Sequence, residues 1–232
     1  MEKLYEGKAK IVYSYEEPDK VVIHFKDETT AFNAQKRDLL EGKGILNNRI
    51  SSIIFELLNR NGIPTHFIRQ LSDREMLAYH TRIIPVEVVV RNLATGSIMK
   101  RLGIPERTEF NPSLIEFYLK NDALGDPIIC YEHVIAMNLA TDEDIREIKE
   151  ISLKVNSLLR NFLKDKGISL IDFKLEFGKT SSGKIMVADE ISPDTCRFWD
   201  LKTEERMDKD RFRLDLGDTT KFYKEVLKRI EG

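Results

Sequence analysis

The chain has 232 residues and a mass of 26.9 kDa, enough for one large domain or two small ones with a buried core. Apolar residues make up 41% and charged residues 33%, which argues against a disordered chain or a membrane protein. Lysine and arginine number 37 against 39 acidic residues, so the net charge of -2 gives no bias toward nucleic acid. Any anion site must therefore be built locally.

The cysteines and the first residues bear on the compartment. Cys130 and Cys196 lie in unrelated contexts, which indicates neither a disulfide framework nor a zinc site. The start, MEKLYEGKAK, lacks the apolar core of a signal peptide, and no segment approaches the ~20 apolar residues of a membrane span. We therefore expect a cytoplasmic protein with no membrane partner.

Strands and one helix are expected in the first third of the chain. Leu4–Ser14 and Lys20–Lys26 are typical of strands around a turn and predict an antiparallel sheet. Helical spacing of isoleucine and leucine predicts a helix over Asn47–Asn61, which Gly62 ends. A further short strand is predicted at Thr65–Arg69.

A strand and the longest helix are expected next. The β-branched run Pro85–Arg91 predicts a strand that leads into a turn of small residues. The helix is predicted over Asp142–Lys166, because Thr141 and Asp144 occupy capping-box positions and Gly167 supplies the stop.

The last elements complete the fold prediction. We expect a hairpin of Ser169–Phe177 and Ile185–Glu190, then an amphipathic helix over Thr219–Ile230. Strands and helices do not alternate regularly and no repeat is present, so we predict an α+β fold of antiparallel sheets with flanking helices. A hinge at Ile83–Pro85 would divide the chain into two domains, residues 1–83 and 84–232.

The stretch Leu170–Gly178, LIDFKLEFG, alternates charged and apolar residues. Because successive side chains of a strand point to opposite faces, Asp172, Lys174 and Glu176 share one face, while the apolar residues share the other. Such a row suits a site that holds an anionic substrate together with cations. A solvent-facing hairpin with alternating charge has equal weight on this pattern alone.

The length of the turn in this hairpin sets the register of its two strands, and therefore which residue of the second strand lies beside the charged row. A four-residue loop at Thr180–Gly183 pairs Lys179 with Lys184. This register makes Asp189 the diagonal neighbour of Glu176, about 7–8 Å away. Two carboxylates that leave room for phosphate oxygens suit Mg²⁺, which keeps several ligands from outside the protein.

Two segments resemble phosphate-binding loops. The hairpin turn matches most of a P-loop, but Ile185 replaces the required Ser or Thr and a strand follows, so we reject it. Near the N-terminus, Gly7 lets the backbone approach a phosphate, the small Ala9 keeps the loop low, and Lys8 or Lys10 can reach a phosphate charge. A charged β-turn is the alternative. The predicted nucleotide loop consists of Gly7, Lys8, Ala9 and Lys10.

Arginines mark further candidate anion sites. Arg91 precedes a small-residue turn in which Ser97 begins a helix, so both can bind a phosphate; an ordinary strand-to-helix junction is equally weighted. Arg197, Arg211 and Arg213 lie beside aromatic residues and can bind carboxylate or phosphate, although a solvated charged loop is commoner. The four histidines, His24, His66, His80 and His133, have no metal spacing and are expected to be structural.

Several segments together resemble the family of phosphoribosylaminoimidazole-succinocarboxamide synthases, the SAICAR synthetases. They follow the family's order over nearly the whole chain and are long and distinctive. The matching segments are LYEGKAK at Leu4–Lys10, EGKGILNNRIS at Glu41–Ser51, IPVEVVVRNLATGSIMKRLGI at Ile84–Ile104, LKNDALGDP at Leu119–Pro127, LIDFKLEFG at Leu170–Gly178, DEISPDTCRFWD at Asp189–Asp200 and MDKDRFR at Met207–Arg213.

The resemblance implies a fold related to ATP-grasp and kinase-like nucleotide folds, in which residues 1–83 cover the nucleotide and residues 84–232 carry the metal and substrate site. It implies an ATP-dependent ligase of purine biosynthesis that joins L-aspartate to the carboxylate of carboxyaminoimidazole ribonucleotide (CAIR). The products are SAICAR, ADP and phosphate, and the proposed intermediate is an acyl phosphate. A homodimer is expected from the family alone.

The resemblance also implies roles for single residues. Gly7, Lys8, Ala9 and Lys10 match the nucleotide loop, and Glu87, Val88 and Lys120 lie near the nucleoside. Glu176 and Asp189 would hold Mg²⁺. The residues expected to bind CAIR or to act on the transferring group are Arg91, Ser97, Asp172, Lys174, Arg197 and Arg213, among which Asp172, Lys174 and Arg197 are the expected catalytic residues.

Two alternatives remain at this point. A regulatory protein could keep the nucleotide cleft without ligation, although the intact charged row at Asp172, Lys174 and Glu176 argues against it. A small-molecule kinase could use the same glycine loop, but the chain has no HRD-type catalytic loop.

Overall fold

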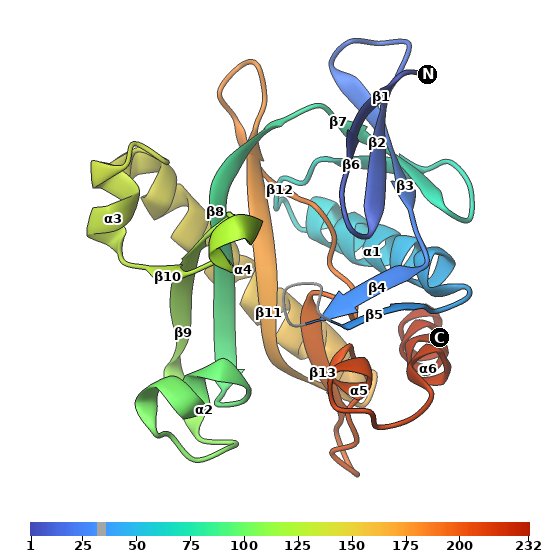
Figure 1. Cartoon of the computed structure of the whole chain (residues 1–232), viewed down its shortest axis with the longest axis vertical. Coiled ribbons are helices and arrows are strands. Elements are labelled where there is room, and N and C mark those ends of the chain that lie inside the picture. The colour runs from blue at the N-terminus through green and yellow to red at the C-terminus, as the bar shows by residue number, and fades with distance from the viewer. Residues whose placement is uncertain (32–35) are drawn as a thin grey trace.

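The computed structural model describes residues 1–31 and 36–232. Two main sheets, both built from antiparallel pairs, lie with helices packed against them (Figure 1). This arrangement confirms the predicted α+β class. No helix in the described part of the chain combines the length and the apolar character needed to cross a membrane.

The first sheet has five strands in the order β1-β2-β3-β7-β6. The predicted strand Leu4–Ser14 is two strands, because the chain reverses at Gly7, whose N–H donates to the carbonyl of Lys10 at 2.8 Å. The other two predicted strands are present with bounds shifted by one or two residues. The five strands are β1 (Lys3–Glu6), β2 (Lys10–Ser14), β3 (Lys20–Phe25), β6 (Phe67–Gln70) and β7 (Glu75–Tyr79).

Helix α1 (Lys43–Arg60) packs on this sheet and begins four residues before the predicted start. The residue before the helix offers no side-chain cap. Instead the Asp27 carboxylate accepts hydrogen bonds from the N–H groups of Gly42, at 3.2 Å, and Gly44, at 2.8 Å. Because this cap comes from a residue distant in the chain, no local sequence signal marks the true start of the helix.

The second sheet has six strands in the order β10-β9-β8-β11-β12, and β13 pairs with β11 as well. Along one edge of β11, residues up to Phe173 pair with β13, and residues from Glu176 onward pair with β12. Between them the chain from β12 to β13 leaves the sheet beside Lys174. The strands are β8 (Arg82–Leu93), β9 (Glu109–Leu119), β10 (Ile128–Ile129), β11 (Ile168–Lys179), β12 (Ile185–Ala188) and β13 (Cys196–Asp200).

The predicted register of the β11–β12 hairpin is wrong by one residue. Lys179 pairs with Ile185, not with Lys184, and Glu176 lies opposite Ala188. The turn is longer than expected, because the N–H of Thr180 donates to the carbonyl of Lys184 at 3.0 Å. A one-residue shift would place Asp189 on the apolar face. The ladder ends before Asp189, however, and Asp189 adopts a left-handed conformation with φ of 63°.

Two predicted helices are confirmed. Helix α4 (Asp142–Asp165) packs across β8, β11 and β12, and its predicted capping box is present: Thr141 Oγ1 accepts from the N–H of Asp144 at 3.1 Å, and Asp144 Oδ2 accepts from the N–H of Thr141 at 2.9 Å. Helix α6 (Thr219–Glu231) packs against α1, so the C-terminal helix lies beside the helix that covers the first sheet (Figure 1).

Other elements were not predicted. Strand β9 contains Pro112 and several polar residues, which hide its strand character. The remaining ones are too short to show a periodic pattern. They are β4 (Glu28–Ala31), β5 (Lys36–Leu39), the 3₁₀ turn η1 (Asp122–Leu124), α3 (Tyr131–Ala136) and α5 (Asp210–Arg213), together with β7, β10 and β13. For α2 (Ser97–Leu102), only the start at Ser97 was predicted.

Candidate active site

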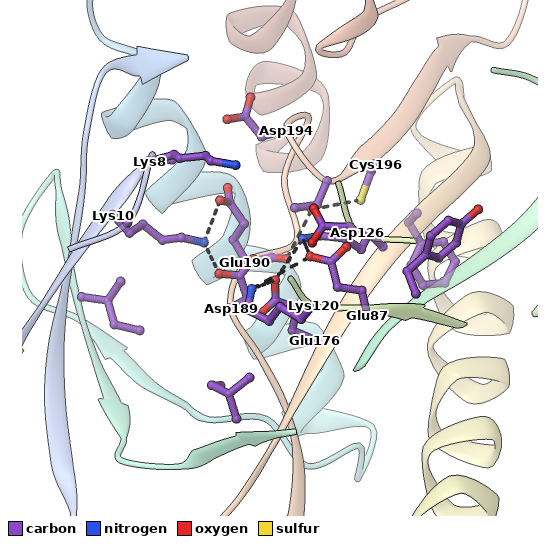
Figure 2. A pocket seen from close by; sticks show the side chains of 18 of the residues that line it. Lys8, Lys10, Glu87, Lys120, Asp126, Glu176, Asp189, Glu190, Asp194 and Cys196 are labelled. Carbon is purple, nitrogen blue, oxygen red and sulfur yellow. Dashed lines mark hydrogen bonds and ion pairs between the residues drawn. The ribbon is translucent and has the colours of Figure 1, made fainter. Parts of the chain in front are cut away.

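A cavity of about 930 Å³ lies between the two sheets and takes its lining from both of them (Figure 2). The first sheet contributes the Gly7–Lys10 loop, and the second contributes the charged face of β11. The chain between β12 and β13 lines it as well. The charged row of β11 therefore faces a cavity rather than open solvent, which removes the solvated-hairpin alternative.

Lysines from the β1–β2 loop reach across the cavity to the other half of the molecule. The ammonium of Lys10 pairs with Asp189 and, at 2.8 Å, with Glu190. Lys8 reaches Asp122 in η1 at 2.6 Å, and both side chains are exposed. Burial lowers the pKa of Lys10, but the charges of Asp189 and Glu190 outweigh burial and raise its pKa above the usual value.

A second group of charges surrounds Glu176. Lys174 Nζ lies 2.6 Å from Glu87 Oε1 and 2.9 Å from Glu176 Oε1, and Lys120 Nζ lies 2.7 Å from the same Glu176 oxygen. Burial raises the pKa of Glu176, yet Lys174 and Lys120 hold it well below its usual value. Burial raises the pKa of Glu87, and the neighbouring lysines only partly oppose this. Glu176 is therefore ionised.

Arginines dominate the opposite end of the cavity. Asp172 lies directly opposite Arg91 of β8 and Arg197 of β13 in the sheet. Its Oδ2 accepts from Arg91 Nη1 at 2.6 Å and from Arg197 Nη1 at 2.8 Å. Arg213 of α5 also lines the cavity. Burial lowers the pKa of Arg91 and Arg197, but Asp172 and the other carboxylates raise it above the usual value.

The turn before α2 closes this end. Ser97 begins the helix and lines the cavity, as predicted from the junction after Arg91. Gly96 precedes it with φ of 66°, and a Cβ placed there would lie 2.7 Å from Arg197 Nη2. The backbone conformation at position 96, with φ of 66° and ψ of -132°, therefore favours glycine, and the turn approaches Arg197 closely there.

Known proteins similar to this chain share its fold and sequence over nearly their whole length. The family model described as SAICAR synthetase matches residues 3–230. The chain belongs to the SAICAR synthetase family. A phosphoribosylaminoimidazole-succinocarboxamide synthase from Persephonella marina (strain DSM 14350 / EX-H1) is 63% identical over 99% of this chain and 96% of its own.

Solved structures of SAICAR synthetases agree. The crystal structure of the synthase from Ehrlichia chaffeensis has a TM-score of 0.97 and 48% identity, covering 99% of this chain and 98% of its own. A SAICAR synthetase in complex with ADP has a TM-score of 0.94 and 49% identity, covering 97% of this chain and 96% of its own. The predicted family and enzyme class, a SAICAR synthase of purine biosynthesis, are confirmed.

Most residues expected from the SAICAR synthetase resemblance meet in the cavity, with one exception. Lining residues include the Gly7–Lys10 loop, Glu87, Lys120 and the charged row of β11, from Asp172 to Glu176. Val88 does not line it, because alternation along β8 turns the Val88 side chain into the core, where it is 0% exposed, and points Glu87 and Val89 to the cavity. A ligand could contact Val88 only through its backbone.

Arg211 was a candidate anion-binding residue together with Arg197 and Arg213, but its side chain points away from the cavity. Its guanidinium stacks on Phe222 at 3.6 Å and donates to the carbonyl of Leu216. Among the histidines, His24 and His133 make local contacts outside the cavity, whereas His66 and His80 line it. Burial lowers the pKa of His66 to about 4, so it is neutral at pH 7.

Among the cavity-lining residues that follow β12 in the chain, three acidic or basic ones were missed from the sequence. Glu190 pairs with Lys10, and Asp194 and Lys209 line the cavity near each other, 3.9 Å apart. All three lie in DEISPDTCRFWD and MDKDRFR, the segments that carry the family resemblance. Their positions in those segments were the available signal, but spacing alone could not show which side chains turn inward.

The carboxylates fit a divalent cation only in part. The charges of Glu176 and Asp189 both act on the ammonium groups of Lys120 and Lys174, so the two carboxylates share one region of the cavity (Figure 2). Among residues 1–31 and 36–232 no group of three or more His, Cys, Asp or Glu is arranged to hold a metal. An ion here would take two protein carboxylates and complete its shell with phosphate or water, as Mg²⁺ does.

Proposed function

We propose that this cavity binds ATP, CAIR and L-aspartate and joins the aspartate amine to the CAIR carboxylate. The observation that carries the proposal is that the charged row of β11 connects a lysine-rich end to an arginine-rich end within one cavity. The relative solved with ADP supports nucleotide binding in this fold.

The proposed nucleotide end lies under the β1–β2 loop. Gly7, Lys8, Ala9 and Lys10 would contact the phosphates, with Glu87, Lys120 and the Val88 backbone nearer the nucleoside. Lys10 and Lys174 are charged, since the pKa of each is raised by its carboxylate partners. Glu176 and Asp189 would hold Mg²⁺, which would neutralise phosphate charge when bound.

The proposed ribonucleotide end lies at the arginines. Arg91, Ser97 and Arg213 would bind the CAIR phosphate, because guanidinium groups bind phosphate oxygens in pairs. Asp172, Lys174 and Arg197 lie between the two ends and would orient the carboxylate that reacts. This arrangement brings an ATP γ-phosphate and the CAIR carboxylate to the same part of the cavity.

The reaction proposed at this meeting point has two steps. A carboxylate oxygen of CAIR attacks the γ-phosphorus of ATP, ADP leaves, and an acyl phosphate forms. The amine of L-aspartate then attacks the acyl carbon, phosphate leaves and the amine loses a proton, giving SAICAR. The first step is needed because a carboxylate is a poor electrophile until one oxygen becomes a leaving group; Lys174 and Arg197 stabilise the charge on the transferring group.

Three further parts of the proposal concern the whole chain. Residues 1–83 would act as the nucleotide-covering domain and residues 84–232 as the substrate domain, supported by the separation of the two sheets at Tyr79 and Arg82. A cytoplasmic location is supported by two free cysteines. A homodimer rests on the family resemblance and is tested by sedimentation.

The deciding experiment supplies ATP, Mg²⁺ and CAIR with or without L-aspartate and measures SAICAR and ADP. We expect both products, in equal amounts, only when L-aspartate is present. Continued ADP formation that does not depend on L-aspartate and gives no amide product would support the kinase alternative. The absence of turnover in every combination would instead favour a regulatory nucleotide-binding protein.

A further inference from the structure

The arginine end of the cavity belongs to a longer row of seven charged side chains of alternating sign. Each member is paired with the next, and the row crosses both β and α elements from α2 to α5. Its members, in order, are Arg101, Glu116, Arg91, Asp172, Arg197, Asp210 and Arg213.

Glu116 holds the first part of this row. One of its oxygens accepts from Arg91 Nε at 2.7 Å and the other from Arg101 Nη2 at 2.5 Å. The hydroxyl of Tyr118 donates to the same carboxylate at 2.9 Å. Glu116 is 7% exposed, and in the sheet it is the diagonal neighbour of Arg91, because Leu114 lies directly opposite Arg91.

Asp210 holds the other end in the same way. One of its oxygens accepts from Arg197 Nε at 2.7 Å and the other from Arg213 Nη1 at 2.6 Å. It is 5% exposed, in the first turn of α5. Each of these two carboxylates therefore joins two guanidinium groups that would repel each other without it.

The two carboxylates differ from the arginines that they hold in their position relative to the cavity. Arg91, Arg197 and Arg213 line the cavity, whereas Glu116 and Asp210 are not among its described lining residues. We propose that Glu116 and Asp210 are positioning residues for ribonucleotide binding, acting through these arginines. This inference rests on the proposed function, in which the arginines bind CAIR.

The physical basis is the geometry of the guanidinium group. Arg91 has five N–H bonds in one plane, and three of its nitrogens are engaged by Glu116, Asp172 and the hydroxyl of Tyr118, the last at 3.3 Å. These contacts fix the plane, so the remaining N–H bonds keep one direction in the empty enzyme. Without Glu116 the guanidinium could turn about its long side chain, and binding would have to order it first.

The test compares two variants with matched controls. Glu116→Gln and Asp210→Asn keep the size of each side chain and remove its charge. Glu109→Gln, on the same strand as Glu116, and Asp215→Asn, just beyond α5, remove exposed carboxylates that make no contact with the arginine row. We expect KM for CAIR to rise about tenfold in the first two variants, with KM for ATP changed less than about twofold, and no change in the controls.

Two further measurements show whether the effect passes through the arginines. Glu116→Gln and Arg91→Lys, made singly and together, should give effects on KM for CAIR that do not add, because the double variant removes one unit. Thermal unfolding is measured for every variant. Should Glu116→Gln fail to fold, Tyr118→Phe removes, without changing charge, the hydroxyl that donates to Glu116 and accepts from Arg91 and Arg101, and it should still raise KM for CAIR, by a smaller factor.

Other outcomes would overturn the inference. Equal changes in KM for all three substrates, lower thermal stability with unchanged KM for CAIR, or additive effects with Arg91→Lys would each assign Glu116 and Asp210 a purely structural role. If the wild-type enzyme shows no turnover, the proposed function fails, and calorimetric binding of CAIR replaces KM. Loss of affinity in the two variants then still supports positioning, whereas equal affinity, or no CAIR binding by the wild type, rejects it.

Discussion

At the scale of single residues, two carboxylates place negative charge at the end of the cavity where we propose that ATP binds. Glu176 lies in β11 and Asp189 directly follows β12, and they reach the same region of the cavity by different means. Glu176 does so by strand alternation, and Asp189 by a left-handed backbone conformation after the ladder ends. Lysines balance both charges.

We predict that Glu176→Gln or Asp189→Asn abolishes SAICAR formation while the fold is retained. Each change removes a charge that the proposed Mg²⁺ needs, and asparagine tolerates the backbone conformation at position 189. Turnover is measured over a Mg²⁺ titration, with circular dichroism as the control for folding. Near-normal activity of either variant at any Mg²⁺ concentration would contradict the shared-metal assignment.

A second prediction at this scale concerns Gly96. Gly96→Ala introduces a Cβ 2.7 Å from Arg197 Nη2 at a position with φ of 66°, so we expect a loss of about 1 kcal/mol of stability and a rise in KM for CAIR of at least about tenfold.

The matched control for this prediction is Gly103→Ala at the other end of α2. Its φ is 64°, but a Cβ there meets nothing within 4 Å. This variant should lose no more stability than Gly96→Ala, because Gly103 has the ordinary left-handed conformation with ψ of 22° whereas ψ of Gly96 is -132°, and it should keep its CAIR dependence. If both variants behave alike in the CAIR titration, the contact between Gly96 and Arg197 has no role in binding.

At the scale of elements, the start of α1 depends on Asp27. Both Asp27 oxygens are held by Arg74 at 2.8 Å, in addition to the two N–H groups at the helix start. Hydrogen bonds from Arg74, with those from Gly44 and Gly42, lower the pKa of Asp27 to about 2 although burial opposes the change. The helix that covers the first sheet is thus anchored to the end of β3.

The lowered pKa sets the sign of a pH effect. Ionised Asp27 stabilises the fold above its unfolded pKa of about 4, and this stabilisation, about 2 kcal/mol, is lost as pH falls through about 2. We predict that Asp27→Asn lowers the free energy of unfolding in urea by about 2 kcal/mol at pH 7 and by much less at pH 2. Asp38→Asn, an exposed carboxylate nearby, is the control. An equal loss at both pH values would show that charge is not the cause.

At the scale of the whole molecule, a buried ion pair joins three distant parts of the chain. Lys43 at the start of α1 and Asp194 beside the cavity are 2.8 Å apart and are 1% and 4% exposed. The hydroxyl of Tyr223 in α6 donates to Asp194 at 2.7 Å. Burial raises the pKa of Asp194, but Lys209 and Lys43 hold it well below its usual value.

Removing one member of this pair leaves a buried charge. We predict that Lys43→Met lowers the free energy of unfolding by about 3 kcal/mol or more, because Asp194 loses its nearest cation. The control is Arg49→Met, which breaks an exposed pair between α1 and α6 and should cost less than about 1 kcal/mol. Urea unfolding followed by Trp199 fluorescence measures both. Equal losses would mean that burial of the pair does not matter.

The sequence by itself determined the α+β class, the main helices, the charged row of β11 and the family. Each of these depends on a local pattern: helical spacing for α4, strand alternation for Asp172, Lys174 and Glu176, and long distinctive segments for the resemblance. The hairpin register, the single strand over Leu4–Ser14 and the start of α1 were predicted wrongly, because they depend on one extra turn residue, on the chain reversal at Gly7 and on a cap from Asp27.

Only the tertiary structure decided which charges meet. Asp27 caps a helix from outside it, Asp194 finds Lys43 and Tyr223, and Glu116 joins Arg91 to Arg101, and none of these pairs is close enough in the chain to leave a periodic signal. Long-range pairing depends on how strands are ordered in a sheet and how helices cover it. Local spacing therefore predicts the face on which a charge lies, whereas the packing of distant elements selects its partner.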